Sequence, residues 1–167
     1  TNINTFIQNT SEDLELIPLP LSHSFGLGRL RCNFLLGASI ALANGFLLPG
    51  KIFRQLTETK ASGISFVPAG AAVLFKFGGE KLGNFRDQLR YIEIGSAPMP
   101  LEHKKILMKL LPKTRICMHY GLTEASRSSF LEFHEDAEHL GSIGRATPGV
   151  RIQVQDERGG PCQTGVR

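Results

Sequence analysis

The chain has 167 residues, and 41% of them are hydrophobic, which is enough for one α/β unit with a core of its own. It contains 19 lysine and arginine residues against 15 aspartate and glutamate residues, and the net charge of +4 is spread along the chain without a long basic run. Nucleic acid is therefore not expected as a partner, whereas a mildly basic surface suits a small anionic ligand.

The cysteines and the apolar stretches narrow the class of protein further. Cys32, Cys117 and Cys162 are odd in number and far apart, so we expect reduced structural thiols in a cytoplasmic protein rather than disulfides or a zinc site. The apolar stretch 30–48 is interrupted by polar and charged residues, so no transmembrane segment is predicted, and the start shows no signal peptide. The chain begins without Met and stops in a turn-like stretch, and we interpret it as a piece of a longer protein.

Short apolar runs alternate with amphipathic helical segments along the chain. In chain order, we predict an irregular polar segment at 1–15 that could hold the tail of a helix, a brief strand at 16–21, a helix at 27–36, a strand at 38–43, a helix at 51–60, a strand at 64–67, a helix at 69–77, a loop at 78–84, a strand at 90–94, a helix at 101–111, and strands at 115–119, 127–133 and 150–155. This alternation predicts an α/β fold with a parallel sheet flanked by helices over 1–140. Residues 141–167 are predicted to begin a separate, incomplete β-rich subdomain.

The helix predicted at 101–111 has a clear amphipathic pattern. The residues predicted to face the core are Leu101, Ile106, Leu107, Leu110 and Leu111, and those predicted to face solvent are Lys104, Lys105 and Lys109. We interpret the three lysines as a solvated face and not as a phosphate site.

The stretch 115–126 carries the strongest sign of chemistry. Its strand ends at Tyr120 and Gly121, and Thr123 and Glu124 follow at once on a tight turn. A loop at the end of a parallel strand is where open α/β sheets bind ligands. Glycine lets backbone approach a ligand, threonine donates a hydroxyl, glutamate offers a hard oxygen to a divalent cation, and tyrosine offers a flat face to a planar base. The alternative is an ordinary turn in which Thr123 and Glu124 cap the next segment.

A second strand-then-glycine loop follows the strand at 90–94. Gly95, Ser96, Ala97 and Pro98 are small, so main-chain groups there could reach the faces and edges of a flat base. The alternative is a plain strand-to-helix turn with a proline at the helix start. A nucleophilic serine is not supported, because the G-x-S-x-G pattern is absent.

A third candidate lies before the helix predicted at 27–36. His23 stands near the start of this helix, where an imidazole can hydrogen-bond a carboxylate or phosphate oxygen. The alternative for His23 is a structural capping role, and Ser22 or Ser24 could also cap the helix.

Four segments of the chain resemble signature motifs of the adenylate-forming superfamily. This superfamily includes acyl-CoA synthetases, luciferase-like enzymes and the adenylation domains of nonribosomal peptide synthetases. Residues 120–124 (YGLTE) resemble Y-G-x-T-E, 20–26 (PLSHSFG) resemble P-L-x-H-x-x-G, and 95–99 (GSAPM) resemble G-[GSA]-A-P-[LM]. Residues 141–149 resemble G-S-x-G-x-P-x-x-G, with Ala146 where proline is usual. Along the chain, these segments follow one another in the same order as the motifs of the family. The resemblance covers almost the whole chain, which corresponds to the middle of the family's large N-terminal domain.

The resemblance implies an enzyme that joins ATP and a small-molecule carboxylate into an acyl-adenylate and pyrophosphate. Thr123 would contact a phosphate oxygen, Glu124 would bind Mg²⁺, and His23 would contact the acyl carboxylate, so these three are the predicted catalytic residues. The predicted nucleotide-binding residues are Gly95, Ser96, Ala97, Pro98, Tyr120, Gly121 and Thr123. The predicted residues of the acyl pocket are His23, Phe25 and Gly95.

The same resemblance implies a second step onto CoA or a carrier pantetheine thiol, with an acyl carrier protein as a candidate partner. The family's phosphate loop would precede Thr1, and its ribose-binding Asp and C-terminal adenylation Lys would follow Arg167, so we expect this piece alone to be inactive. Phe25 and the small residues at 69–72 favour an apolar acid, as in fatty acid metabolism. The alternatives are a nonribosomal-type adenylation domain, or a non-catalytic nucleotide-binding or scaffold module.

Overall fold

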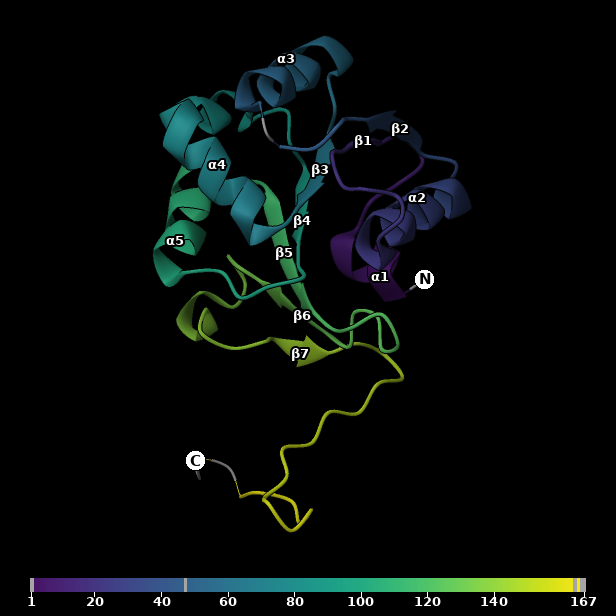
Figure 1. Ribbon diagram of the computed structural model, residues 1–167, viewed down its shortest axis with the longest axis vertical. Coiled ribbons are helices and arrows are strands. Elements are labelled where there is room, and N and C mark those ends of the chain that lie inside the picture. The colour runs from purple at the N-terminus through teal and green to yellow at the C-terminus, as the bar shows by residue number, and fades with distance from the viewer. Residues whose placement is uncertain (1, 47, 164, 166–167) are drawn as a thin grey trace.

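The computed structural model describes residues 2–46, 48–163 and 165 (Figure 1). Its helices are α1 (Asn2–Ile7), α2 (Ser24–Leu36), α3 (Pro49–Thr59), α4 (Pro68–Gly78) and α5 (Leu101–Leu110), with 3₁₀ helices η1 (Gly79–Phe85) and η2 (Ala137–His139). Its strands are β1 (Leu14–Ile17), β2 (Ser39–Leu42), β3 (Gly63–Phe66), β4 (Tyr91–Ile94), β5 (Arg115–Tyr120), β6 (Ser129–Glu132) and β7 (Arg145–Ala146). The predicted alternation of strands and helices is confirmed.

All the strands form one sheet in the order β2-β1-β3-β4-β5-β6-β7. The pairs from β2 to β5 are parallel, which confirms the predicted parallel sheet, but β6 and β7 run antiparallel. The connection between β5 and β6 spans only residues 121–128 and contains no helix. A parallel pair needs a crossover of a dozen or more residues, so this short turn reverses the chain.

The helices cover both faces of the sheet (Figure 1). The helices α3, α4 and α5 lie on one face, and their buried side chains pack against Ile64, Ile92 and Ile116. The helices α1 and α2 lie on the other face, where Ile7 packs against Tyr91. Strands buried on both faces explain the nearly continuous apolar runs in the sequence.

Proline and glycine set several helix boundaries. Pro49 and Pro68 stand at the first positions of α3 and α4, where the missing N–H costs nothing. Gly37 ends α2 in the left-handed conformation, with φ of 73°, which a residue without Cβ adopts at no steric cost. The helix α2 begins at Ser24, three residues earlier than predicted.

Two segments predicted as mostly irregular contain regular structure. Residues 1–15 hold α1 and the first residues of β1, and residues 78–84 form most of η1. The helix α1 has only six residues, but its Ile7 is 1% exposed and packs with Tyr91 and Cys117. Such a short helix is stabilised by tertiary packing and not by local propensity.

The prediction of a strand at 150–155 is wrong. This segment joins no strand ladder, and the nearest pairing is an isolated bridge between Gln155 and Pro161. Val154 is 70% exposed, so no packing favours a sheet there. The strand β7, by contrast, extends the main sheet beyond residue 140, while the division into parts 1–140 and 141–167 stays a prediction. None of the described helices has the length and apolar content that a bilayer span needs.

Asp13 links the start of β1 to two neighbouring strands. Its carboxylate accepts hydrogen bonds from Ser62 Oγ at 2.7 Å, from the Thr10 backbone N–H at 2.7 Å and from Arg90 Nη1 at 2.6 Å. Burial alone would raise the pKa of Asp13, but these hydrogen bonds and the charge of Arg90 lower it below its ordinary value.

A depressed carboxyl pKa contributes stability that is present above the unfolded-state pKa and is lost as the pH falls through the folded-state pKa. We therefore expect Asp13→Asn to lower the free energy of unfolding at pH 7 by about 2 kcal/mol, and the difference from wild type to shrink below about pH 4. Denaturant unfolding across this pH range measures both effects. The exposed neighbour Glu12, changed to Gln, is the control and should have little effect. A pH-independent loss in Asp13→Asn would contradict the assignment.

Candidate active site

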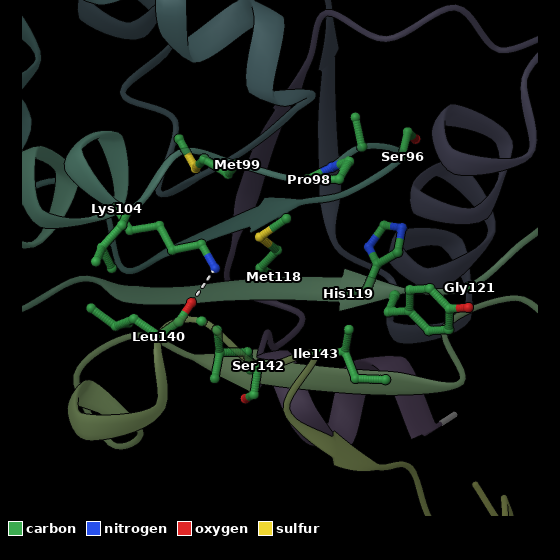
Figure 2. Close-up of a pocket in the computed structure, with 15 residues that line it drawn as sticks. Ser96, Pro98, Met99, Lys104, Met118, His119, Gly121, Leu140, Ser142 and Ile143 are labelled. Atoms are coloured by element: carbon green, nitrogen blue, oxygen red, sulfur yellow. Dashed lines mark hydrogen bonds between the residues drawn. The ribbon is translucent and has the colours of Figure 1, made fainter. Parts of the chain in front are cut away.

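Two neighbouring parallel strands deliver the predicted nucleotide-binding segments to one edge of the sheet. The strand β4 ends at Ile94 and β5 ends at Tyr120, and the two pair in parallel register. The loop that starts at Gly95 and the loop that starts at Gly121 therefore emerge side by side. A cavity of about 470 Å³ lies between them (Figure 2). It is lined by Ser96, Ala97, Pro98, Tyr120 and Gly121, among others.

Gly95 is required by its contact with His119. A Cβ added at Gly95 would lie 2.0 Å from His119 Cε1, so no side chain fits there while the imidazole keeps its place. His119 lines the same cavity (Figure 2), its side chain is 8% exposed, and its Nδ1 lies 2.8 Å from Glu93 Oε1. His119 was not predicted as a site residue from the sequence. It lies two residues after Cys117, on the same side of the strand, near the strand end at Tyr120.

Ser96 stands where two cavities meet. It lines the cavity beside Tyr120 and also a second cavity of about 450 Å³. Its φ is +74°, in the left-handed region that residues with a Cβ rarely adopt. Backbone held in such a conformation by its surroundings is typical of functional sites.

The second cavity contains the predicted acyl-pocket residues His23 and Phe25. His23 is the N-cap residue of α2, but its side chain makes no capping hydrogen bond, so the structural alternative finds no support there. Phe25 is 5% exposed and meets the His119 ring edge to face, with centroids 4.6 Å apart. The remaining walls are mostly apolar and include Leu19, Phe46, Val67 and Val73.

Thr123 and Glu124 lie exposed on the tight turn between β5 and β6. The turn depends on Gly121, because a Cβ there would lie 2.5 Å from the Arg127 backbone N. The hydroxyls of Thr123 and Ser24 are 3.4 Å apart, so this turn reaches the segment that carries His23. The element that follows is the strand β6, and the alternative of an ordinary turn at Thr123 and Glu124 stays a prediction.

Glu124 is the predicted magnesium ligand. Among the described residues, no group of three or more His, Cys, Asp or Glu side chains is placed to hold a metal ion. Magnesium commonly binds through one or two carboxylates together with substrate phosphates and water. A single exposed carboxylate therefore fits a metal ion that arrives with a nucleotide, and does not fit an ion held by protein alone.

Lys104 is buried, which contradicts the prediction of a solvated lysine face. Its Nζ donates to the Leu140 carbonyl at 2.5 Å (Figure 2) and lies 5.5 Å from the centroid of the Phe133 ring. Burial lowers the pKa of Lys104. Lys105 and Lys109 are exposed as predicted, whereas Leu101, predicted to be buried, is 48% exposed.

The helix phase explains this error. Lys104 shares one face of α5 with Leu107 and Leu110, at spacings of three residues, and this face packs on the sheet. The long aliphatic part of the lysine side chain lines the cavity beside Met118, and its amino group reaches a carbonyl.

The chain belongs to the AMP-binding enzyme family, because the model of that family matches residues 1–167. It is 31% identical over 169 residues to the acyl-CoA ligase sidI of Beauveria bassiana (strain ARSEF 2860), covering 95% of this chain and 28% of that protein. It is 28% identical over 145 residues to acyl-CoA synthetase 7 of Caenorhabditis elegans, covering 86% of this chain and 26% of that protein. The chain thus spans less than a third of the length of these curated relatives.

Among solved structures, CmiS6 has the same fold over nearly the whole chain. Its crystal structure superposes with a TM-score of 0.87 at 26% identity, covering 99% of this chain and 41% of CmiS6. The α/β fold of this chain is therefore shared with a protein of known structure.

The contact between Gly95 and His119 can be tested by adding one methyl group. We expect Gly95→Ala to weaken AMP binding by about tenfold or more, because the methyl must displace a buried imidazole that Glu93 holds. The control is Gly141→Ala, since Gly141 lines the same cavity but a Cβ there would meet nothing within 4 Å. Calorimetric titration of the full-length protein with AMP measures both variants. Equal affinities for Gly95→Ala and wild type would contradict the assignment.

Proposed function

We propose that the protein carrying this chain is an AMP-forming ligase that activates a carboxylic acid. One carboxylate oxygen attacks the α-phosphorus of ATP, the bond from that phosphorus to the bridging oxygen of the β-phosphate breaks, and acyl-adenylate and pyrophosphate form. The observation that carries this proposal is the pair of cavities that meet at Ser96, one beside Tyr120 and one beside His23. Two cavities with a shared wall suit two substrates that must react at one point.

The roles of the residues follow from this layout. The base would lie in the cavity between Tyr120 and the loop that carries Ser96, and the acid would lie in the cavity beside His23. Thr123, whose hydroxyl is 3.4 Å from that of Ser24, would donate to an oxygen of the α-phosphate. Glu124 would hold Mg²⁺ together with the phosphates, and the ion would neutralise charge that develops on the phosphate oxygens.

The second cavity favours an apolar acid. Its walls are mainly apolar, and the polar side chains among its lining residues are His23 and Ser96. His23 would contact the carboxylate, and the apolar walls would take up the rest of the acid. The names of the relatives, acyl-CoA ligase and acyl-CoA synthetase, support CoA as the acceptor of the acyl group in a second step. A carrier-protein thiol as acceptor and a cytoplasmic location stay predictions.

ATP–pyrophosphate exchange by the full-length protein tests the proposal. The assay should cover fatty, aromatic and amino acids. We expect exchange that depends on an apolar acid, and dependence on an amino acid would instead indicate a nonribosomal-type adenylation domain. A folded protein that binds AMP but shows no exchange with any acid would overturn the proposal in favour of a non-catalytic nucleotide-binding module.

The roles of Glu124 and Thr123 predict different losses. Glu124→Gln should lower exchange by about a hundredfold or more while AMP binding changes little, because AMP lacks the β- and γ-phosphates that bring the metal. Thr123→Ala should weaken both exchange and AMP binding, because its hydroxyl contacts the α-phosphate. The exposed Glu138, changed to Gln, is the matched control. Near-normal pyrophosphate release by Glu124→Gln would show that the metal assignment is wrong.

A further inference from the structure

Glu93 is a fully buried carboxylate that joins three side chains from separate parts of the chain. It lies in the middle of β4 and is 0% exposed. Arg127 Nε donates to its Oε1 at 2.7 Å, His119 Nδ1 lies 2.8 Å from the same oxygen, and Arg29 Nε lies 3.1 Å from Oε2. Burial raises the pKa of Glu93, but the charges of Arg127 and Arg29 outweigh it and hold the pKa well below its usual range.

A second buried carboxylate, Glu15, shares Arg29 with Glu93. Glu15 lies in β1, is also 0% exposed, and accepts from Arg29 Nη2 at 2.5 Å. Its other donors are Asn33 Nδ2 at 2.6 Å, Ser65 Oγ at 2.5 Å and Tyr91 Oη at 3.0 Å. The two carboxylates and the guanidinium groups of Arg29 and Arg127 balance in charge, which is the condition for burying them.

The two carboxylates differ in the location of the residues that they contact. The partners of Glu15 are core side chains from α2, β3 and β4. Glu93, in contrast, contacts His119, whose ring stands against Gly95, and Arg127, which ends the turn that carries Thr123 and Glu124.

Arg127 links this turn to the acyl side of the site. Its guanidinium carbon lies 5.1 Å from the centroid of the Phe25 ring, and its Nη2 lies 3.5 Å from the Phe25 carbonyl. A Cβ at Gly28 would lie 2.7 Å from Arg127 Nη1, so α2 leaves room for this side chain. The φ of Arg127 is +57°, an unfavourable conformation that persists only where surrounding contacts fix it.

We propose that Glu93 is a positioning residue of the active site. It fixes the His119 ring against Gly95, and through Arg127 it fixes both the turn 121–127 and the position of Phe25. This inference rests on the proposed function for its kinetic readout only, because the position of the turn can be measured without turnover. The competing explanation is that Glu93 only balances buried charge, as Glu15 does.

The comparison of Glu93→Gln with Glu15→Gln separates these explanations in the full-length protein. Each variant neutralises one buried carboxylate that pairs with Arg29, so both should lower the melting temperature. We expect only Glu93→Gln to lower kcat for adenylation by about a hundredfold, as a misplaced catalytic group does. Glu15→Gln should keep kcat near the wild-type value.

Hydrogen–deuterium exchange of the turn supplies the readout that does not need activity. Peptides covering 121–128 should exchange faster in Glu93→Gln than in wild type, and should exchange at the wild-type rate in Glu15→Gln. If wild type shows no adenylation, the proposed function fails, and this exchange measurement still decides the role of Glu93. If the two variants change kcat and exchange alike, the positioning role is overturned.

Arg127→Gln keeps the inference testable if Glu93→Gln does not fold. It removes the same link from the side of the turn and leaves Glu93 paired with Arg29 and His119. We expect Arg127→Gln to show a comparable loss in kcat and faster hydrogen exchange at 121–128. Where both single variants fold, the double variant should lose little more kcat than either single variant. Wild-type exchange and kcat in Arg127→Gln would overturn the link between Glu93 and the turn.

Discussion

The parallel pairing of β4 with β5 is the constraint on which the site depends. Both strands are buried between two layers of helices, so a shift of register by one residue would exchange the side chains on their two faces. Such a shift would move Glu93 into the apolar layer under α4 and α5 and carry Ile92 to the face of α2. The observed register instead places the loop after Ile94 beside the loop after Tyr120. The cavity between these loops is therefore a product of strand pairing.

Local patterns were sufficient to predict most of the fold. Apolar runs marked the strands, and Pro49 and Pro68 stand at the first positions of α3 and α4. The direction of β6 was missed, although the shortness of the 121–128 connection is a signal for it. The burial of Lys104 was missed because a lysine on an amphipathic helix is ordinarily solvated, and only the tertiary position of Leu140 supplies the carbonyl that pairs with it.

The sequence motifs predicted the segments that form the candidate site, but not the buried residues that hold these segments in position. The loops at Gly95 and Tyr120 and the segment at His23 do come together around Ser96. The role of Glu93 was missed, because its partner Arg127 is 34 residues away in the chain and burial of a charge depends on such distant contacts. One local signal exists: β1 and β4 read LELI and YIEI, each with a single carboxylate inside an apolar run.

The buried ionic cluster is hard to explain by stability alone. Removing charges from water is costly, and apolar side chains of similar volume often serve a core as well or better. An apolar core would not, however, fix the direction of its side chains as a carboxylate does when it accepts a hydrogen bond from Arg127 and pairs with Arg29. Arg127, whose backbone conformation is strained, ends a surface turn, and its side chain is held by Glu93 in β4. In the proposed role, Glu93 therefore fixes that turn relative to β4. Under the proposed positioning role, the stability that the charges cost is exchanged for the position of the turn that carries Thr123 and Glu124.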